Sequence, residues 1–203
     1  MSDGLVWLQE SFPEGFTVAF CEGLSPQGFI EALGGELNST LMLTRDQSEA
    51  IELYGHFPED TDLEAFDLDK EELNDMGFLR PDTAVLRFGA VNNWAFAIQS
   101  FGSFAAAPGV ALHASAGRRY ISFSRTANMA CWFQYVIDGE VANSFDPLHP
   151  VQGRAGGLAV EEISVSDDPV SAVLCCLESQ LSLSIPKSSD FDYRIAAAFG
   201  GDM

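Results

Sequence analysis

Residues 15–35 read GFTVAFCEGLSPQGFIEALGG, and this stretch decides the predicted fold. Every second residue from Phe16 to Phe20 is large and apolar, which is the two-residue period of a half-buried β-strand. Ser25-Pro26 predicts a helix start, because a serine side chain caps free backbone N–H groups and proline suits the first helical position. Gly34-Gly35 ends the helix. The stretch therefore predicts a strand, a short loop and a helix.

A similar unit is predicted near the end of the chain. A strand pattern covers Leu158–Ser166, with apolar residues at alternate positions. Asp167-Asp168-Pro169 again combines a helix cap with an early proline, and Val170–Leu181 continues with apolar residues at helical spacing. A last helix is predicted at Asp190–Phe199, and residues 200–203 are expected to fray.

The middle of the chain is rich in strand patterns. Two hairpins are predicted, because turn-forming Gly, Asn and Asp residues separate short alternating runs. The first hairpin pairs Thr83–Phe88 with Trp94–Gln99, and the second pairs Cys131–Ile137 with Val141–Phe145. Between the two hairpins the patterns predict a helix at Pro108–Ala116 and a further strand at Arg119–Arg125. No linker rich in Pro, Ser or Gly divides the chain. We therefore expect a single α+β domain over residues 1–203, a mostly antiparallel twisted sheet with helices packed on one side.

The charge of the chain is strongly unbalanced. There are 30 acidic and 10 basic residues, a net charge of −20. Residues 46–75, here called the acidic segment, hold twelve acids and one base, which is eleven of the twenty net negative charges. Short helices are predicted at Ser48–Tyr54 and Leu68–Met76, with a loop at Gly55–Phe66.

This charge restricts the partners that the protein can have. Binding to nucleic-acid phosphates or to an anionic membrane needs a basic face, so the composition disfavours both. The acidic segment favours a basic protein or peptide as partner, because opposite charge steers association. Solubility alone is the simpler alternative.

Part of the acidic segment fits the pattern of a calcium-binding loop. Counting from Asp60, acids occupy the first, third, fifth and twelfth positions, where such a loop places oxygen ligands. The sixth position is Ala65, although the sharp turn there requires glycine. We therefore predict no metal site. We predict instead that these acids contact the partner: Asp60, Asp62, Glu64, Asp67 and Asp69.

The four cysteines and three histidines show no catalytic or metal-binding spacing. No CxxC pair occurs, and Cys131 lies in a predicted strand, where burial would raise the pKa of its thiol. Glycine-rich phosphate loops and a nucleophile elbow are absent, so no cofactor is expected. The N-terminus has no signal-peptide pattern, and no apolar run is long enough to span a membrane. We therefore expect a reduced, cytoplasmic protein.

An enzyme with an unfamiliar site is the alternative hypothesis. Asp146 ends a predicted strand close to His149, and Arg118 and Arg119 belong to a basic cluster. Together with His113, these groups would suit a hydrolase or lyase acting on a peptide. The simpler interpretation of Asp146 is a turn in which its carboxylate accepts a nearby backbone N–H.

Four short stretches resemble a family of uncharacterised actinobacterial proteins. They are Gly15–Ser25, Trp94–Ile98, Tyr135–Gly139 and Ser144–Leu148. The likeness covers most of Gly15–Leu181, and its motifs are structural: a strand leading to a helix cap, a tryptophan-containing strand and an Asp-Gly hairpin. The resemblance implies one bacterial cytoplasmic domain and assigns no functional residue. The acidic segment is longer and more charged than this resemblance leads us to expect.

These patterns together favour a binding protein without catalytic activity. Its acidic segment would hold a basic protein or peptide, in the manner of an immunity-type neutraliser of a basic toxin or of an accessory factor for peptide modification. An exposed aromatic side chain within the acidic surface would make a good anchor for such a partner, although spacing alone does not identify one.

Overall fold

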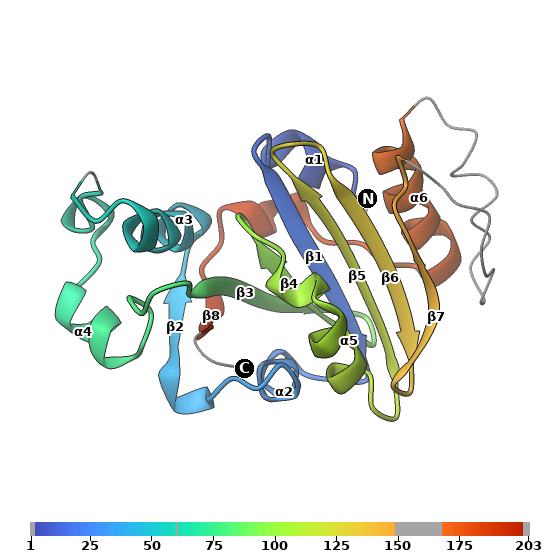
Figure 1. Cartoon of the computed structure of the whole chain (residues 1–203), viewed down its shortest axis with the longest axis horizontal. Coiled ribbons are helices and arrows are strands. Elements are labelled where there is room, and N and C mark those ends of the chain that lie inside the picture. Colours follow the sequence, from blue (N-terminus) through green and yellow to red (C-terminus); the bar gives the residue numbers. More distant parts are fainter. Residues whose placement is uncertain (1–2, 60, 149–167, 201–203) are drawn as a thin grey trace.

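The computed structural model describes residues 3–59, 61–148 and 168–200 of the chain. Eight strands form one sheet (Figure 1): β1 (Gly15–Glu22), β2 (Thr40–Leu43), β3 (Ala84–Val91), β4 (Trp94–Gln99), β5 (Arg119–Thr126), β6 (Cys131–Ile137), β7 (Glu140–Phe145) and β8 (Arg194–Phe199). The α-helices are α1 (Trp7–Ser11), α2 (Pro26–Ala32), α3 (Arg45–His56), α4 (Lys70–Asp75), α5 (Pro108–Ala114) and α6 (Pro169–Leu181). Short 3-10 helices are η1 (Leu37–Ser39), η2 (Glu64–Phe66), η3 (Phe104–Ala106) and η5 (Lys187–Asp190).

The sheet is antiparallel throughout and has the order β2-β8-β3-β4-β1-β5-β6-β7. The first predicted strand, β1, lies inside it, with Phe20 opposite Phe96 on β4 and opposite Ile121 on β5. The α+β class and the antiparallel sheet are thus confirmed. The strand predicted at Leu158–Ser166 lies outside the described residues.

The prediction of a helix at Asp190–Phe199 is wrong. Asp190 ends η5, and Arg194–Phe199 forms β8, which pairs with β2 on one side and with β3 on the other. The alanines of this stretch favour a helix in isolation, but their small side chains fit a buried inner strand. Ala196 and Ala197 are both almost fully buried. Tertiary pairing therefore overrides the local preference.

Helices cover both faces of the sheet, whereas one side was expected. Val18 and Phe20 belong to a cluster that includes residues of α1 and α6. Ala19 and Cys21 point to the opposite face, where the cluster includes residues of α2 and α5. The alternation along β1 therefore separates two apolar layers, and a strand buried on both faces gives no clear polar side in the sequence.

A third apolar cluster attaches the acidic segment to the sheet. Leu63, Leu68 and Leu73 are buried in one cluster with Ile51 of α3 and Val85 of β3. The two helices predicted in the segment are present as α3 and α4, and η2 lies within the predicted loop. Leucines at intervals in the acidic sequence therefore fix the segment, while most of its carboxylates face outward.

The start of α3 is fixed by a capping box. Thr44 Oγ1 accepts the backbone N–H of Gln47 at 3.3 Å, and Gln47 Oε1 accepts the backbone N–H of Thr44 at 3.0 Å. Gln47 Nε2 also donates to the carbonyl oxygen of Phe66 at 3.0 Å, which links η2 to α3. The two bonds of the capping box satisfy backbone N–H groups at the helix start that have no partner within the helix.

We expect Thr44→Ala to lower the free energy of unfolding by about 1 kcal/mol, because one capping hydrogen bond is lost. Urea denaturation followed by circular dichroism measures this change. Thr83→Ala is the matched control, since the Thr83 hydroxyl donates to a carbonyl oxygen in a turn and caps no helix N–H. Equal effects of the two substitutions would contradict the role given to the cap.

Candidate functional site

The acidic segment presents its charges at one end of the molecule, beside the edge strand β2 (Figure 1). Asp69 accepts the backbone N–H groups of Glu71 and Glu72 and so caps α4. The exposed acids of the segment are Asp46, Glu59, Asp62, Glu64, Asp67, Asp69, Glu71, Glu72 and Asp75. Four of the five acids predicted to contact a partner thus lie on this surface, and Asp60 lies outside the described residues.

Three large apolar side chains are exposed among these acids: Leu53, Phe57 and, in η2, Phe66. Leu53 is 40% exposed and Phe57 is 57% exposed. Leu53 lies in the last turn of α3, and Phe57 is the residue that caps this helix end, with its backbone N–H donating to the carbonyl oxygen of Leu53 at 2.7 Å. The ring centroid of His56 is 6.3 Å from that of Phe57. An exposed aromatic side chain within a polar rim is typical of the anchors of protein interfaces.

A pocket of about 280 Å³, here called the Glu52 pocket, opens beside the same end of α3. Glu52 and His56 line it from α3, one helical turn apart. The remaining lining residues lie just before β3, at its first residue, at the end of β4 and in the segment that follows β4: Asp82, Thr83, Ala84, Gln99, Phe101, Gly102, Ser103 and Phe104. Thr83 and Phe104 also line a second pocket of about 520 Å³, which extends toward α2 and β8.

Glu52 is the buried ionisable group of this pocket. Its Oε1 accepts the backbone N–H of Val85 at 3.0 Å and the side-chain amide of Gln99 at 3.3 Å. Its Oε2 is buried and has no hydrogen-bond partner among the described residues. Burial raises the pKa of Glu52 from 4.5 to about 7, and the nearby charge of Glu49 acts in the same direction. The bonds from Val85 and Gln99 oppose this shift.

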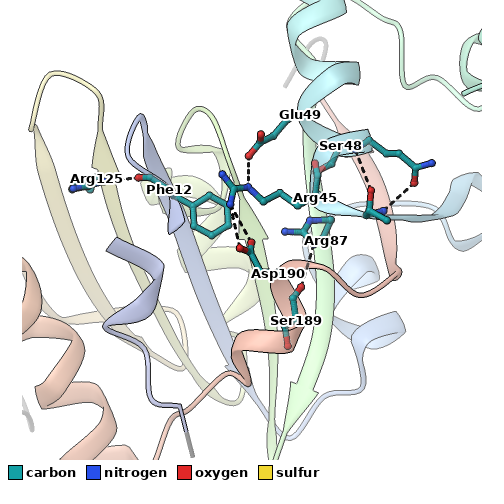
Figure 2. Close-up of polar contacts among 10 residues, drawn as sticks. Phe12, Arg45, Ser48, Glu49, Arg87, Arg125, Ser189 and Asp190 are labelled. Atoms are coloured by element: carbon teal, nitrogen blue, oxygen red, sulfur yellow. Dashed lines mark hydrogen bonds and ion pairs between the residues drawn. The ribbon is translucent and has the colours of Figure 1, made fainter. Parts of the chain in front are cut away.

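The N-terminal end of α3 is held by a second polar cluster (Figure 2). Arg45 pairs with Glu49 at 2.6 Å and with Asp190 of η5 at 3.2 Å. Its guanidinium carbon lies 4.2 Å from the ring centroid of Phe12, which follows α1. The cluster therefore joins α3, η5 and the segment after α1, three elements that are far apart in the sequence.

Arg87 belongs to the same cluster from β3 and is only 1% exposed. Its Nη1 donates to the carbonyl oxygen of Ser189 at 3.3 Å, whereas its Nη2 has no partner among the described residues. Burial lowers the pKa of Arg87 to about 10, while the charge of Asp190 acts against this shift. Asp190 thus balances both Arg45 and Arg87, and Glu49 adds a weaker contribution to the balance of Arg87. Because these charges contact one another and the backbone of η5, we assign the cluster the role of holding α3 in place.

The residues predicted for an enzyme site are not brought to one place. Arg118 and Arg119 lie where β5 begins, and His113 is exposed in the last turn of the preceding helix α5. Asp146 follows β7 and lies at the opposite end of β6, because Arg119 pairs with Ile137 whereas Phe145 pairs with Phe133. His149 lies outside the described residues.

Local contacts account for several described members of that set. Asp146 Oδ1 accepts the backbone N–H of Leu148 at 2.9 Å, which is the turn expected as the simpler interpretation. Arg119 forms an ion pair with Glu22 on β1, and the Nε of Arg118 donates to the carbonyl oxygen of Ala116.

The cysteines behave as buried or isolated thiols. All four are free. Burial raises the pKa of Cys131 to about 11, as predicted, and it also raises the pKa of Cys21 to about 11. Cys176 is buried in α6, whereas Cys175 is exposed, because adjacent helix residues point in different directions. Within the described ranges, no group of three His, Cys, Asp or Glu side chains is placed to hold a metal ion.

Comparison with known proteins places the chain in a family without assigning an activity. The model of a family of unknown function, DUF6461, matches residues 2–164, and the chain belongs to that family. The expected membership of an uncharacterised family is therefore confirmed. No curated protein and no solved structure matches the chain. In the described part of the chain, none of the helices combines the length and the apolar character needed to cross a membrane.

Proposed function

We propose that this protein binds a basic protein or peptide through the acidic segment, centred on the C-terminal end of α3. The observation that carries the proposal is the exposed pair Leu53 and Phe57 within an acidic surface. The carboxylates would steer a basic partner toward this surface, and the apolar pair would supply contact area once it arrives. Neutralisation of a basic toxin and support of peptide modification are both roles of this kind.

The proposed compartment is the cytoplasm of a bacterial cell. This is supported by the four free thiols, since cysteines of a reduced compartment remain unpaired. In that compartment the excess of acidic over basic residues would favour association with basic proteins and peptides over association with other acidic ones.

Capture from lysate at low and at high salt tests the proposal when a four-acid variant is compared with a matched control. The variant removes four charges of the acidic segment by Asp62→Asn, Glu64→Gln, Asp67→Asn and Asp75→Asn. The control removes four exposed charges elsewhere by Glu10→Gln, Glu14→Gln, Glu31→Gln and Glu140→Gln. We expect wild type and control to retain the same basic protein at low salt and release it at high salt. The four-acid variant should retain little of it.

The apolar anchor is tested separately by Phe57→Ala. We expect about a tenfold loss of affinity for the captured partner, with the salt dependence unchanged, because no charge is removed. Equal capture by wild type, control and four-acid variant would contradict the proposal. Loss of capture in the control as well would show that only the total charge matters, which also contradicts it.

A further inference from the structure

The Glu52 pocket has the position and size of a receptor for one side chain of a bound partner. Glu52 and His56 line the pocket from α3 and directly precede Leu53 and Phe57, so a partner that rests on the apolar pair lies close to the pocket. The volume of about 280 Å³ lies just below the usual range for small-molecule pockets. A single side chain fits this scale better than a cofactor does.

The chemistry of the pocket selects a cation. Glu52 is 5% exposed, and its Oε2 has no hydrogen-bond partner among the described residues. The backbone N–H of Phe101 favours the charged carboxylate without completing a hydrogen bond to Oε2. Burying a carboxylate oxygen without a hydrogen-bond donor costs free energy, and a charged donor supplied by a bound partner would remove that cost.

The charged and titratable groups around Glu52 agree with this selection. Glu49 lies one turn earlier on α3, Asp82 lines the pocket before β3, and His56 lines it from α3. The residue that lines the pocket from β4 is Gln99, whose side-chain amide is neutral. Among the described residues that line the Glu52 pocket, none is a lysine or an arginine.

We propose that the Glu52 pocket receives one arginine or lysine side chain of the partner, whose charged group donates to Glu52 Oε2. This inference rests on the proposed function, since it names the side-chain type that the acidic surface recognises. The aromatic rings of Phe101 and Phe104 in the lining would contact the aliphatic part of that side chain. A bound cation stabilises the ionised carboxylate, so binding releases a proton from the fraction of Glu52 that is protonated.

The direct test uses small cations in place of the unidentified partner. N-Ethylguanidinium and n-butylammonium represent the arginine and lysine side chains, and n-butanol is the uncharged control. The carboxyl carbon of Glu52 is observed by ¹³C NMR and assigned by its absence from the spectrum of Glu52→Gln. We expect either cation to lower the pKa of Glu52 from about 7, whereas butanol should leave it unchanged.

The captured partner then provides the second readout. Glu52→Gln should weaken its binding at least tenfold and remove the rise in affinity that accompanies increasing pH near neutrality. The amide introduced by this substitution keeps an oxygen that accepts from Val85 and Gln99, so the docking of α3 is preserved. Glu140→Gln, which removes one exposed charge on the edge strand β7, should bind as wild type does.

The outcomes separate this inference from the proposed function. If neither cation moves the Glu52 resonance, or if Glu52→Gln binds the partner as tightly as Glu140→Gln does, the pocket is not the receptor. The proposed function of the acidic segment would then still be supported if the four-acid variant loses capture of the partner. If the four-acid variant captures normally while the cations shift Glu52, the proposed function fails and the pocket remains a site for amines.

Discussion

Asp190→Ala is expected to lower the free energy of unfolding by about 3 kcal/mol. Asp190 is buried, pairs with Arg45 at 3.2 Å and balances the fully buried Arg87. Its removal leaves the buried Arg87 with only the weaker influence of Glu49, a partly exposed carboxylate, as a compensating charge. The estimate is at the lower end for a broken buried pair, because Arg45 is partly exposed and solvent can take over its charge.

The same geometry predicts partial rescue by a second substitution. Arg87→Met removes the stranded charge and keeps an unbranched, flexible side chain, so the double variant Asp190→Ala/Arg87→Met should be more stable than the sum of the two single effects implies. Urea denaturation of the four proteins of this cycle gives the coupling energy.

Asp192→Ala is the matched control for this cycle. Asp192 is exposed and lies 3.9 Å from Arg194, so we expect its removal to cost about 0.5 kcal/mol or less. If Asp190→Ala costs no more than Asp192→Ala, or if the double variant shows no coupling, the buried cluster does not hold α3 in the manner described.

Glu52→Gln is expected to change the pH dependence of stability by about 3 kcal/mol. The pKa of Glu52 is raised from 4.5 to about 7 in the folded protein. Between these values the folded state binds more protons than the unfolded state, so the free energy of unfolding falls as pH rises. This contribution of the protonated carboxyl is fully present below about pH 4.5 and is lost above about pH 7.

Comparison of the two proteins isolates this single group. The glutamine has no proton to lose, so the stability of Glu52→Gln relative to wild type should increase between about pH 4.5 and about pH 7 and stay constant above that range. Any fixed cost of the amide nitrogen in place of Oε2 is independent of pH. Urea denaturation across this range measures the difference. A constant difference would contradict the burial of an ionisable Glu52 beside the sheet.

The sequence predicts most elements of the fold through periodicity and caps. The alternation in β1 and the serine-proline start of α2 are local signals, and local structure follows them. β8 is the exception, because its alanines favour a helix locally, whereas pairing with β2 on one side and β3 on the other makes it a strand. Local sequence does not contain this pairing. The sequence also did not predict helices on both faces of the sheet. Because β1 is buried on both faces, its side chains alternate between larger and smaller residues and not between apolar and polar ones.

The acidic surface was predictable from composition, whereas the Glu52 pocket was not. Charges far in excess of pairing partners must face solvent, so the position of residues 46–75 on the surface follows from their sequence. Glu52 was one acid among twelve in that segment, and its contact with Gln99 joins residues 47 positions apart. Arg87 within an apolar strand pattern is a local signal of the buried ionic cluster.

Hydrogen–deuterium exchange of the complex with the captured basic partner tests the central claim most directly. The account predicts that binding slows amide exchange at the C-terminal end of α3 and through the described part of residues 46–75, with the largest change near Leu53 and Phe57. Exchange in the edge strand β7 should remain unchanged. Slower exchange confined to β7 or to the α2 and α5 face, with residues 46–75 unaffected, would contradict it.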